Sequence, residues 1–147
     1  MGTLLSAPLL LDSSAWVRIA NDVVPDSRAM EVVEDFAMGR LAVCLPFLLE
    51  TGFSASNKED FALVLEDLAA LPTFPIDGEV ERRALVAQAQ LSRVGHHRIP
   101  PADVIVAAIA DRHEIGVLHY DKDFDVLLEK TGLDFASVWL MPPGSLN

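Results

Sequence analysis

Short continuous runs of apolar residues alternate along this chain with longer segments in which apolar residues recur at helical spacing. A short apolar run bounded by turn residues is typical of a strand that is buried on both faces of a parallel sheet. The runs predict strands at residues 8–12, 41–45 and 116–120, with an edge strand at 136–140. The turn-rich connector 72–78 has room for one more short strand.

The segments between these runs have the apolar spacing of amphipathic helices, with capping or helix-ending residues at their bounds. They predict helices at residues 14–20, 26–38, 46–56, 58–71, 79–93 and 122–130, and one more around 104–110. Because the 104–110 segment is apolar on every side, its helix should be central. In the second helix we expect Met30, Val33, Phe36 and Ala37 to point inward; in the fourth, Phe61, Leu65 and Leu68 should share the apolar face.

Strands that alternate with helices imply right-handed crossovers and a parallel sheet covered on both faces. The predicted fold is therefore a three-layer α/β/α domain with a central parallel sheet of four or five strands. The chain has 147 residues, of which 51% are hydrophobic, so residues 1–147 can form a single domain with its own core.

The single cysteine and the N-terminal segment indicate a cellular compartment. Cys44 is the single cysteine of the chain, so an internal disulfide is excluded, and its position in an apolar run favours a buried hydrophobe over a catalytic thiol. Residues 1–11 contain no basic residue, and their apolar run is broken by Pro8 and ended by Asp12. We therefore expect that this segment is neither a secretory signal nor a membrane span. The protein is expected to be cytoplasmic.

The charge balance restricts the possible partners. The chain has 22 acidic residues against 11 Lys and Arg, a formal net charge of -11. Affinity for a nucleic-acid backbone comes from Lys and Arg, so unaided nucleic-acid binding is disfavoured. Binding is still possible if metal ions bridge acidic side chains to phosphate, or if the acidic surface belongs to a basic protein partner.

Five carboxylates lie in or beside the apolar segments, where an unpaired ionised acid costs several kcal/mol. They are Asp12, Glu50, Asp103, Asp121 and Asp123. Two of them follow predicted strands, two open predicted helices, and Glu50 lies one turn into the helix after the second strand. Because strand ends and the starts of the following helices share one edge of a parallel sheet, we expect the five to converge there. No basic residue lies inside these segments, so a divalent cation, Mg²⁺ or Mn²⁺, is the simplest partner.

Each acid taken alone also has a structural explanation. Asp12 and Asp121 could be helix caps, Asp103 and Asp123 could complement helix dipoles, and Glu50 could be a solvated edge residue. The weaker candidates are polar or basic: Ser13 and Ser14 as caps or donors, His96 and His97 as solvated loop residues, His119 as a packed core histidine, and Arg98 as a phosphate contact or an ion-pair partner of the acids.

The motifs Leu10-Leu11-Asp12-Ser13-Ser14-Ala15, Leu49-Glu50, Gly95-His96-His97-Arg98 leading to Asp103-Val104-Ile105-Val106-Ala107-Ala108, and His119-Tyr120-Asp121-Lys122-Asp123-Phe124 together resemble the PIN-domain ribonucleases. The resemblance is greatest to VapC-type toxins of bacterial toxin–antitoxin pairs, and it spans almost the whole chain. One position departs from the pattern, because many PIN domains have Thr or Ser where this chain has His119.

The resemblance implies a PIN-like fold and a Mg²⁺- or Mn²⁺-dependent endoribonuclease toxin, commonly dimeric and inhibited by a cognate VapB-type antitoxin. In that family the four core acids correspond to Asp12, Glu50, Asp103 and Asp121, and Asp123 is a frequent additional acid. The implied products carry a 5′-phosphate and a 3′-hydroxyl. RNA would be held by the metal and by Ser14, Arg98 and Lys122, with Arg18 a further cation. The alternatives are a degenerate PIN domain that only binds protein, and a phosphoryl-acceptor signalling domain of the receiver type.

Overall fold

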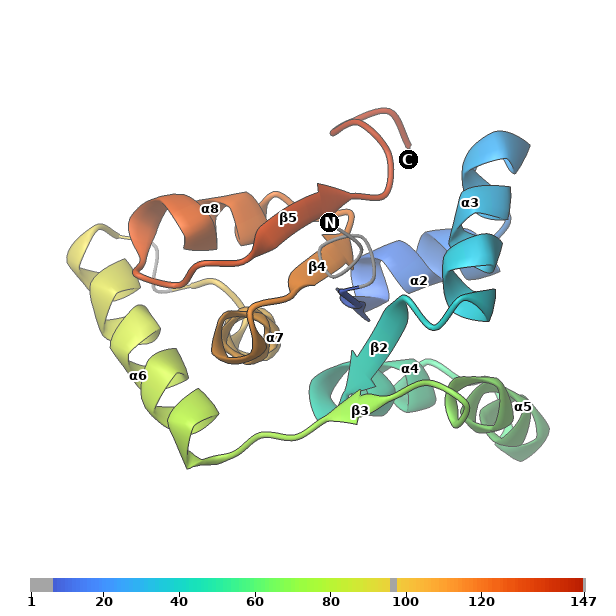
Figure 1. Ribbon diagram of the computed structural model, residues 1–147, viewed down its shortest axis with the longest axis horizontal. Coiled ribbons are helices and arrows are strands. Elements are labelled where there is room, and N and C mark those ends of the chain that lie inside the picture. Colours follow the sequence, from blue (N-terminus) through green and yellow to red (C-terminus); the bar gives the residue numbers. More distant parts are fainter. Residues whose placement is uncertain (1–6, 96–97, 147) are drawn as a thin grey trace.

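The computed structural model describes residues 7–95 and 98–146. Within them, five parallel strands form one sheet in the order β3-β2-β1-β4-β5 (Figure 1). The strands are β1 (Leu9–Leu11), β2 (Leu41–Cys44), β3 (Thr73–Phe74), β4 (Gly116–His119) and β5 (Ala136–Trp139). All the predicted strands are therefore present, including the short one in the 72–78 connector.

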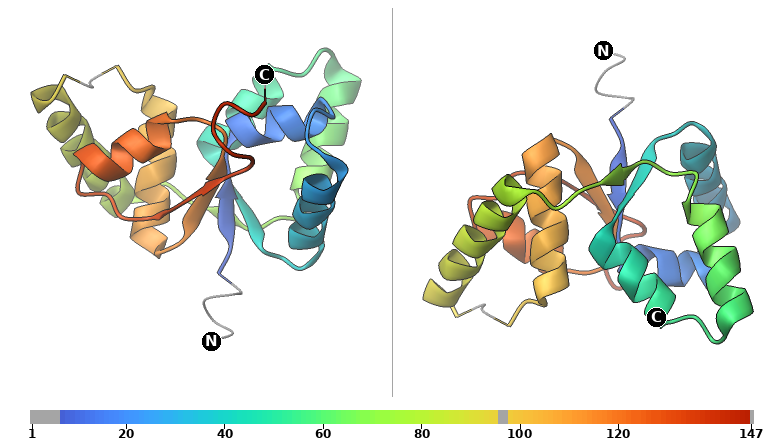
Figure 2. Two further views of the ribbon diagram at one scale, coloured as in Figure 1. Left: turned by 90° about the horizontal axis from the view of Figure 1, so that it is seen from above. Right: turned by 90° about the horizontal axis from the view of Figure 1, so that it is seen from below.

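The helices also follow the predicted order, with bounds that differ by a few residues. They are α2 (Ser13–Ala20), α3 (Asp26–Ala37), α4 (Leu45–Phe53), α5 (Lys58–Leu68), α6 (Gly78–Arg93), α7 (Pro101–His113) and α8 (Asp123–Lys130). Figures 1 and 2 show α6, α7 and α8 on one side of the sheet, with α2, α3 and α5 on the other. The predicted three-layer α/β/α architecture is confirmed.

The strand order places a crevice at one edge of the sheet. β1 pairs with β2 on one side and with β4 on the other, so the chain order reverses between β1 and β4. At such a point the crossover helices leave on opposite faces, which opens a crevice beyond the carboxyl ends of the strands. α4 begins directly after β2 and packs against both α2 and α7, so it borders this crevice.

Two of the predicted helix faces are wrong in part. On α3, Met30 and Val33 are 71% and 66% exposed, and Ala37 is exposed as well, while Val32 is buried and Phe36 packs on the core as predicted. On α5, Leu68 is buried, but Phe61 and Leu65 are exposed. Both helices carry apolar residues on two adjacent faces, and periodicity does not tell which of the two meets the sheet.

The core fills the space between the sheet and the helices. α7 is the most buried helix, with Val104 and the run Val106–Ala110 all buried, which confirms its predicted central position. Cys44 is fully buried, and burial raises the pKa of its thiol to about 12. A thiol in this state is neither accessible nor ionised at neutral pH, so Cys44 is a core residue, as predicted.

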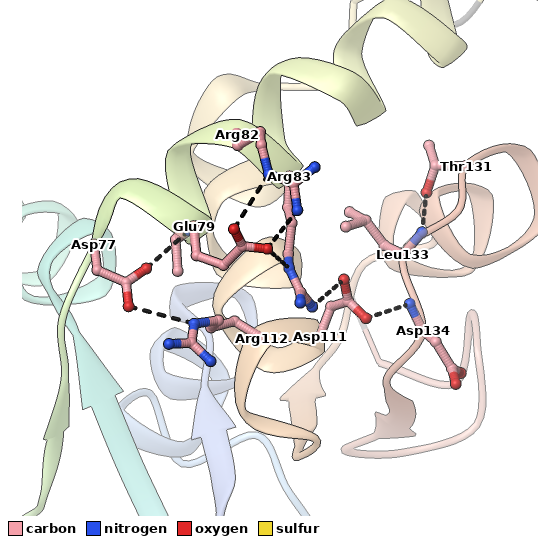
Figure 3. A network of polar contacts seen from close by, with 10 residues as sticks. Asp77, Glu79, Arg82, Arg83, Asp111, Arg112, Thr131, Leu133 and Asp134 are labelled. Carbon is pink, nitrogen blue, oxygen red and sulfur yellow. Dashed lines mark hydrogen bonds and ion pairs between the residues drawn. The ribbon is translucent and has the colours of Figure 1, made fainter.

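A network of ion pairs stabilises the C-terminal end of α7, the end far from Asp103 (Figure 3). Arg83 on α6 pairs with Glu79 at 3.1 Å and with Asp111 on α7 at 3.0 Å, and Arg112 pairs with Asp77 at 3.3 Å. On α7, Asp111 and Arg112 lie at least two helical turns after Asp103, which is roughly 12 Å or more along the helix axis. The arginines of this network therefore stabilise the α6–α7 packing and do not neutralise the acids at the crevice.

None of the helices in the described part of the chain is long and apolar enough to cross a lipid bilayer.

Candidate metal centre

Asp12 stands where β1 gives way to α2. Its backbone N–H donates to the carbonyl of Leu118 (3.0 Å), which continues the pairing of β1 with β4 by one residue. Its Oδ2 accepts from the backbone N–H of Ser14 (3.0 Å) and from the Ser14 hydroxyl (2.6 Å). Asp12 is thus the N-cap of α2, one of the two roles considered for it, and it is only 2% exposed. Both bonds go to Oδ2, so within the described structure Oδ1 remains available to a ligand.

The Ser14 side chain links the end of β1 to the end of β4. Its hydroxyl donates to Asp12, which follows β1, and its oxygen accepts from the backbone N–H of Tyr120, which follows β4, at 2.9 Å. Its hydroxyl proton is already committed to Asp12, so a role for Ser14 in binding substrate, which stays a prediction, would have to use its oxygen or a rearranged hydroxyl.

Three carboxylates come together beyond β4. One oxygen each from Asp103, Asp121 and Asp123 lies within 4.8 Å of the other two. Asp121 follows β4, and its Oδ1 accepts from the backbone N–H of Asp123 at 2.9 Å. Asp103 reaches the same point from the first turn of α7. The predicted convergence of strand ends and helix starts therefore brings three of the five acids into a group that can share one cation.

Asp103 is the least compensated of these acids. It is 8% exposed, and its Oδ2 is buried without a hydrogen-bond partner in the described structure. Burial raises the pKa of its carboxyl to about 8, with further contributions from repulsion by Asp12, Asp121, Asp123 and Glu50. Burial also raises the pKa of Asp12, although the Ser14 hydrogen bonds oppose the shift. A divalent cation would satisfy the orphaned oxygen and relieve the repulsion, so these residues fit a metal ion.

Glu50 and Asp12 flank this group of three without belonging to it. Glu50, on α4, lines the same crevice as Asp12, Asp103 and Asp121, and its Oε1 accepts from the Ser13 hydroxyl at 2.9 Å. It is exposed, so the expectation that all five acids lie in buried surroundings is wrong for Glu50. Its neighbours Leu49 and Phe53 are 62% and 91% exposed, so this side of α4 faces solvent and does not pack on the core.

The crevice, which has a volume of about 1120 Å³, extends from the acids into an apolar groove. Its walls include Val17 from α2, Leu49 and Phe53 from α4, and Leu63 from α5, all of them more than two-fifths exposed. This apolar wall was not predicted from the sequence. The sequence does contain a signal for it, because Leu49 and Phe53 are four residues apart in one predicted helix and therefore lie on the same side of that helix, next to Glu50.

The predicted cations lie outside the groove. Arg98 and Lys122 are exposed, do not line it, and form no ion pair within the described residues. Arg98 is therefore not the ion-pair partner of the acids. Arg18 lies over the ring of Tyr120, 4.5 Å from its centroid, and its Nη1 donates to the carbonyl of Ser14 at 2.8 Å. His96 and His97 fall outside the described residues.

His119 is a packed core histidine, as predicted. It is fully buried between the rings of Phe124 and Trp139, with centroid distances of 4.8 and 4.9 Å. Burial lowers the pKa of its imidazole to about 4, so the ring is neutral at physiological pH.

Comparison with known proteins agrees with this fold. The model of the PIN domain family matches residues 9–129. Ribonuclease VapC2 of Mycobacterium tuberculosis (strain CDC 1551 / Oshkosh) is 34% identical over 140 residues, covering 92% of this chain and 96% of the relative. Ribonuclease VapC18 of M. tuberculosis (strain ATCC 25618 / H37Rv) is 30% identical over 139 residues, covering 92% and 97%.

Solved structures share the fold at lower sequence identity. The DNA-bound VapBC from Salmonella typhimurium has a TM-score of 0.73 at 16% identity, covering 92% of this chain and 99% of that one. VapBC2 from Rickettsia felis, bound to a promoter DNA fragment, has a TM-score of 0.69 at 14% identity, covering 88% and 97%. The chain belongs to the PIN-domain family, and its relatives are VapC ribonucleases. The receiver-type alternative is therefore wrong.

Proposed function

We propose that this protein is a metal-dependent endoribonuclease toxin that cleaves RNA by water attack on the phosphodiester and is inhibited by a cognate VapB-type antitoxin. The observation that carries the proposal is the group formed by Asp103, Asp121 and Asp123, with one carboxylate oxygen orphaned in a buried site. The relatives named as VapC ribonucleases support the substrate, and the VapBC complexes among the structural neighbours support the antitoxin.

The residues of the site would have separate roles in this reaction. Asp103, Asp121 and Asp123 would hold the ion, with Asp12 beside them. A bound Mg²⁺ or Mn²⁺ supplies Lewis-acid activation of the scissile phosphate and of a water molecule. Glu50, which is exposed in the crevice, would accept the proton of the attacking water. The water oxygen bonds to phosphorus, the bond to the 3′ oxygen breaks, and that oxygen takes a proton from solvent, which leaves a 5′-phosphate and a 3′-hydroxyl.

The test is cleavage of RNA by the purified protein with Mn²⁺, with Mg²⁺ and with a chelator, followed by sequencing of the RNA ends. We expect cleavage only in the presence of a divalent ion, and products that ligate to adaptors requiring a 5′-phosphate. Cleavage that continues at full rate in the chelator would contradict the proposal. No cleavage under any condition, with antitoxin binding retained, would favour the alternative of a degenerate PIN domain that acts as a protein-binding module.

The groove also suits the antitoxin. An extended segment with apolar side chains and an arginine would bury the exposed wall of Val17, Leu49, Phe53 and Leu63 while placing positive charge on the acids. The net charge of -11 favours such a basic partner.

The predicted homodimer stays a proposal as well. Met30 and Val33 offer apolar surface on α3 for a second copy, which sedimentation of the isolated chain would test.

Phe53→Ala should weaken antitoxin binding, because Phe53 is the most exposed large apolar residue of the groove wall. A central aromatic anchor typically contributes about 2 kcal/mol, which corresponds to roughly 30-fold in the dissociation constant. Calorimetry with a peptide from the C-terminal segment of the antitoxin encoded beside this gene measures the change. Leu85→Ala is the matched control, since Leu85 on α6 is 68% exposed and does not line the groove. Equal affinity of the two variants would place the antitoxin elsewhere.

A further inference from the structure

A chain of hydrogen bonds connects the backbone of Asp121 to side chains of β5 and α8. The N–H of Asp121 donates to Nδ1 of His119 at 3.1 Å. Nε2 of His119 lies 2.7 Å from the Ser137 hydroxyl oxygen, and that hydroxyl donates to Oδ1 of Asp125 at 2.6 Å. The other carboxylate oxygen of Asp125 accepts from the indole N–H of Trp139 at 2.9 Å. The chain thus joins the end of β4, the middle of β5 and the first turn of α8.

The partners determine which imidazole nitrogen carries the proton. A backbone N–H can only donate, so Nδ1 of His119 must be the acceptor and must be unprotonated. In the neutral ring the proton is then on Nε2, which donates to the oxygen of Ser137. The Ser137 hydroxyl in turn donates a hydrogen bond to Asp125, whose carboxylate can only accept. Every donor in the chain has one acceptor, and the direction runs without conflict from Asp121 to Asp125.

We infer that Ser137 and Asp125 act as positioning residues for the metal centre, because they fix the tautomer and orientation of His119, which in turn fixes the backbone of Asp121. The inference rests on the proposed metal site. If Nδ1 were protonated, it would face the Asp121 N–H donor to donor, and the two groups would separate. Since Asp121 Oδ1 also holds the N–H of Asp123, such a movement would displace two of the three clustered carboxylates together.

The same bond explains how this chain accommodates a histidine before the fourth acid. A Ser or Thr side chain can accept the backbone N–H two residues further on. His119 makes that contact through Nδ1, but unlike a hydroxyl it needs a partner on its far nitrogen to stay in the correct tautomer. Ser137 and Asp125 supply that partner.

The test compares the Mn²⁺ affinity of the full chain with that of Ser137→Ala and Ser137→Thr. Ser137→Ala removes the acceptor for Nε2, and we expect a rise of roughly tenfold in the Mn²⁺ dissociation constant, as for other outer-shell partners of metal sites. Ser137→Thr keeps the hydroxyl and should restore affinity close to that of the wild type. Ser92→Ala is the matched control, since Ser92 is exposed on α6 and its hydroxyl, among the described residues, donates to the Ala89 carbonyl of the same helix. Electron paramagnetic resonance of free Mn²⁺ measures the constants without any need for RNA cleavage.

Two further measurements separate positioning from a merely structural role. For Ser137→Ala, saturating Mn²⁺ should restore most of the RNA cleavage rate, so the defect is in the metal requirement. The metal-free variant should melt below Ser92→Ala, because the buried Nε2–H of His119 loses its acceptor, and Ser137→Thr should restore the melting temperature together with the Mn²⁺ affinity. A lower melting temperature with unchanged Mn²⁺ affinity would overturn the inference, as would equal affinities of Ser137→Ala and Ser92→Ala. Failure of the wild type itself to bind Mn²⁺ would instead overturn the proposed metal site, and this inference with it.

Discussion

Asp121→Asn should abolish RNA cleavage and relieve growth inhibition on expression, while leaving the fold and antitoxin binding intact. Asparagine keeps the shape of the side chain, and its carbonyl oxygen can still accept from the N–H of Asp123. It removes one negative charge from the group of three that would hold the ion. Because outer-shell changes at metal sites already cost roughly 10- to 100-fold, loss of a ligand should exceed 100-fold in cleavage rate.

The control for this experiment is Asp134→Asn, the same chemical change at an exposed position away from the crevice. Cleavage of a labelled RNA in Mn²⁺ and the growth of expressing cells give the two readouts. Asp12→Asn should behave as Asp121→Asn does, since it keeps the cap of α2 and loses the charge. Growth inhibition that survives Asp12→Asn, with no metal-dependent cleavage by the wild type, would assign the toxicity to a binding module and not to a nuclease.

The second large effect is on stability, and it depends on pH and metal. Asp103 has a folded-state pKa of about 8, raised from 3.8, so between these values the folded chain holds a proton that the unfolded chain has lost. The free energy of unfolding of the metal-free protein should therefore fall as pH rises through this window. His119 acts in the opposite direction, because its pKa is lowered from 6.5 to about 4, and its contribution is complete by about pH 6.5. The decline should therefore be seen most clearly between about pH 6.5 and 8.

Asp103→Asn should remove much of that decline and should stabilise the metal-free protein at pH 7, by about 4 kcal/mol at most. In the wild type, Mn²⁺ should raise the melting temperature, and more so at pH 8 than at pH 6.5, because the ion binds the ionised carboxylate and binds only the folded state. Asp103→Asn should lose this response, while Asp134→Asn should keep both the pH dependence and the metal response. A wild-type melting temperature that is the same with and without millimolar Mn²⁺ would show that the acids are not a metal site.

Both experiments depend on a placement of acids that the sequence made predictable. Asp12 and Asp121 each directly follow an apolar run, and Asp103 and Asp123 open helices. In a parallel sheet these positions share one edge, so their meeting follows from topology alone. The central position of α7 and the burial of Cys44 and His119 could also be predicted from the sequence, because each lies in a segment without a polar face.

The sequence by itself determined the order and type of the elements, the three-layer architecture and the edge at which the acids gather. These properties follow from local apolar runs and from the handedness of crossovers, which need no knowledge of distant contacts. Only the tertiary structure decided which face of α3 and α5 meets the core, that Asp103, Asp121 and Asp123 approach most closely, and that Leu49 and Phe53 wall an open groove. It also decided that His119 turns Nδ1 toward Asp121 and Nε2 toward Ser137. Such features depend on contacts between segments far apart in the chain, where a shift of one residue in helix phase or a different ring orientation changes the partner while the local pattern stays the same.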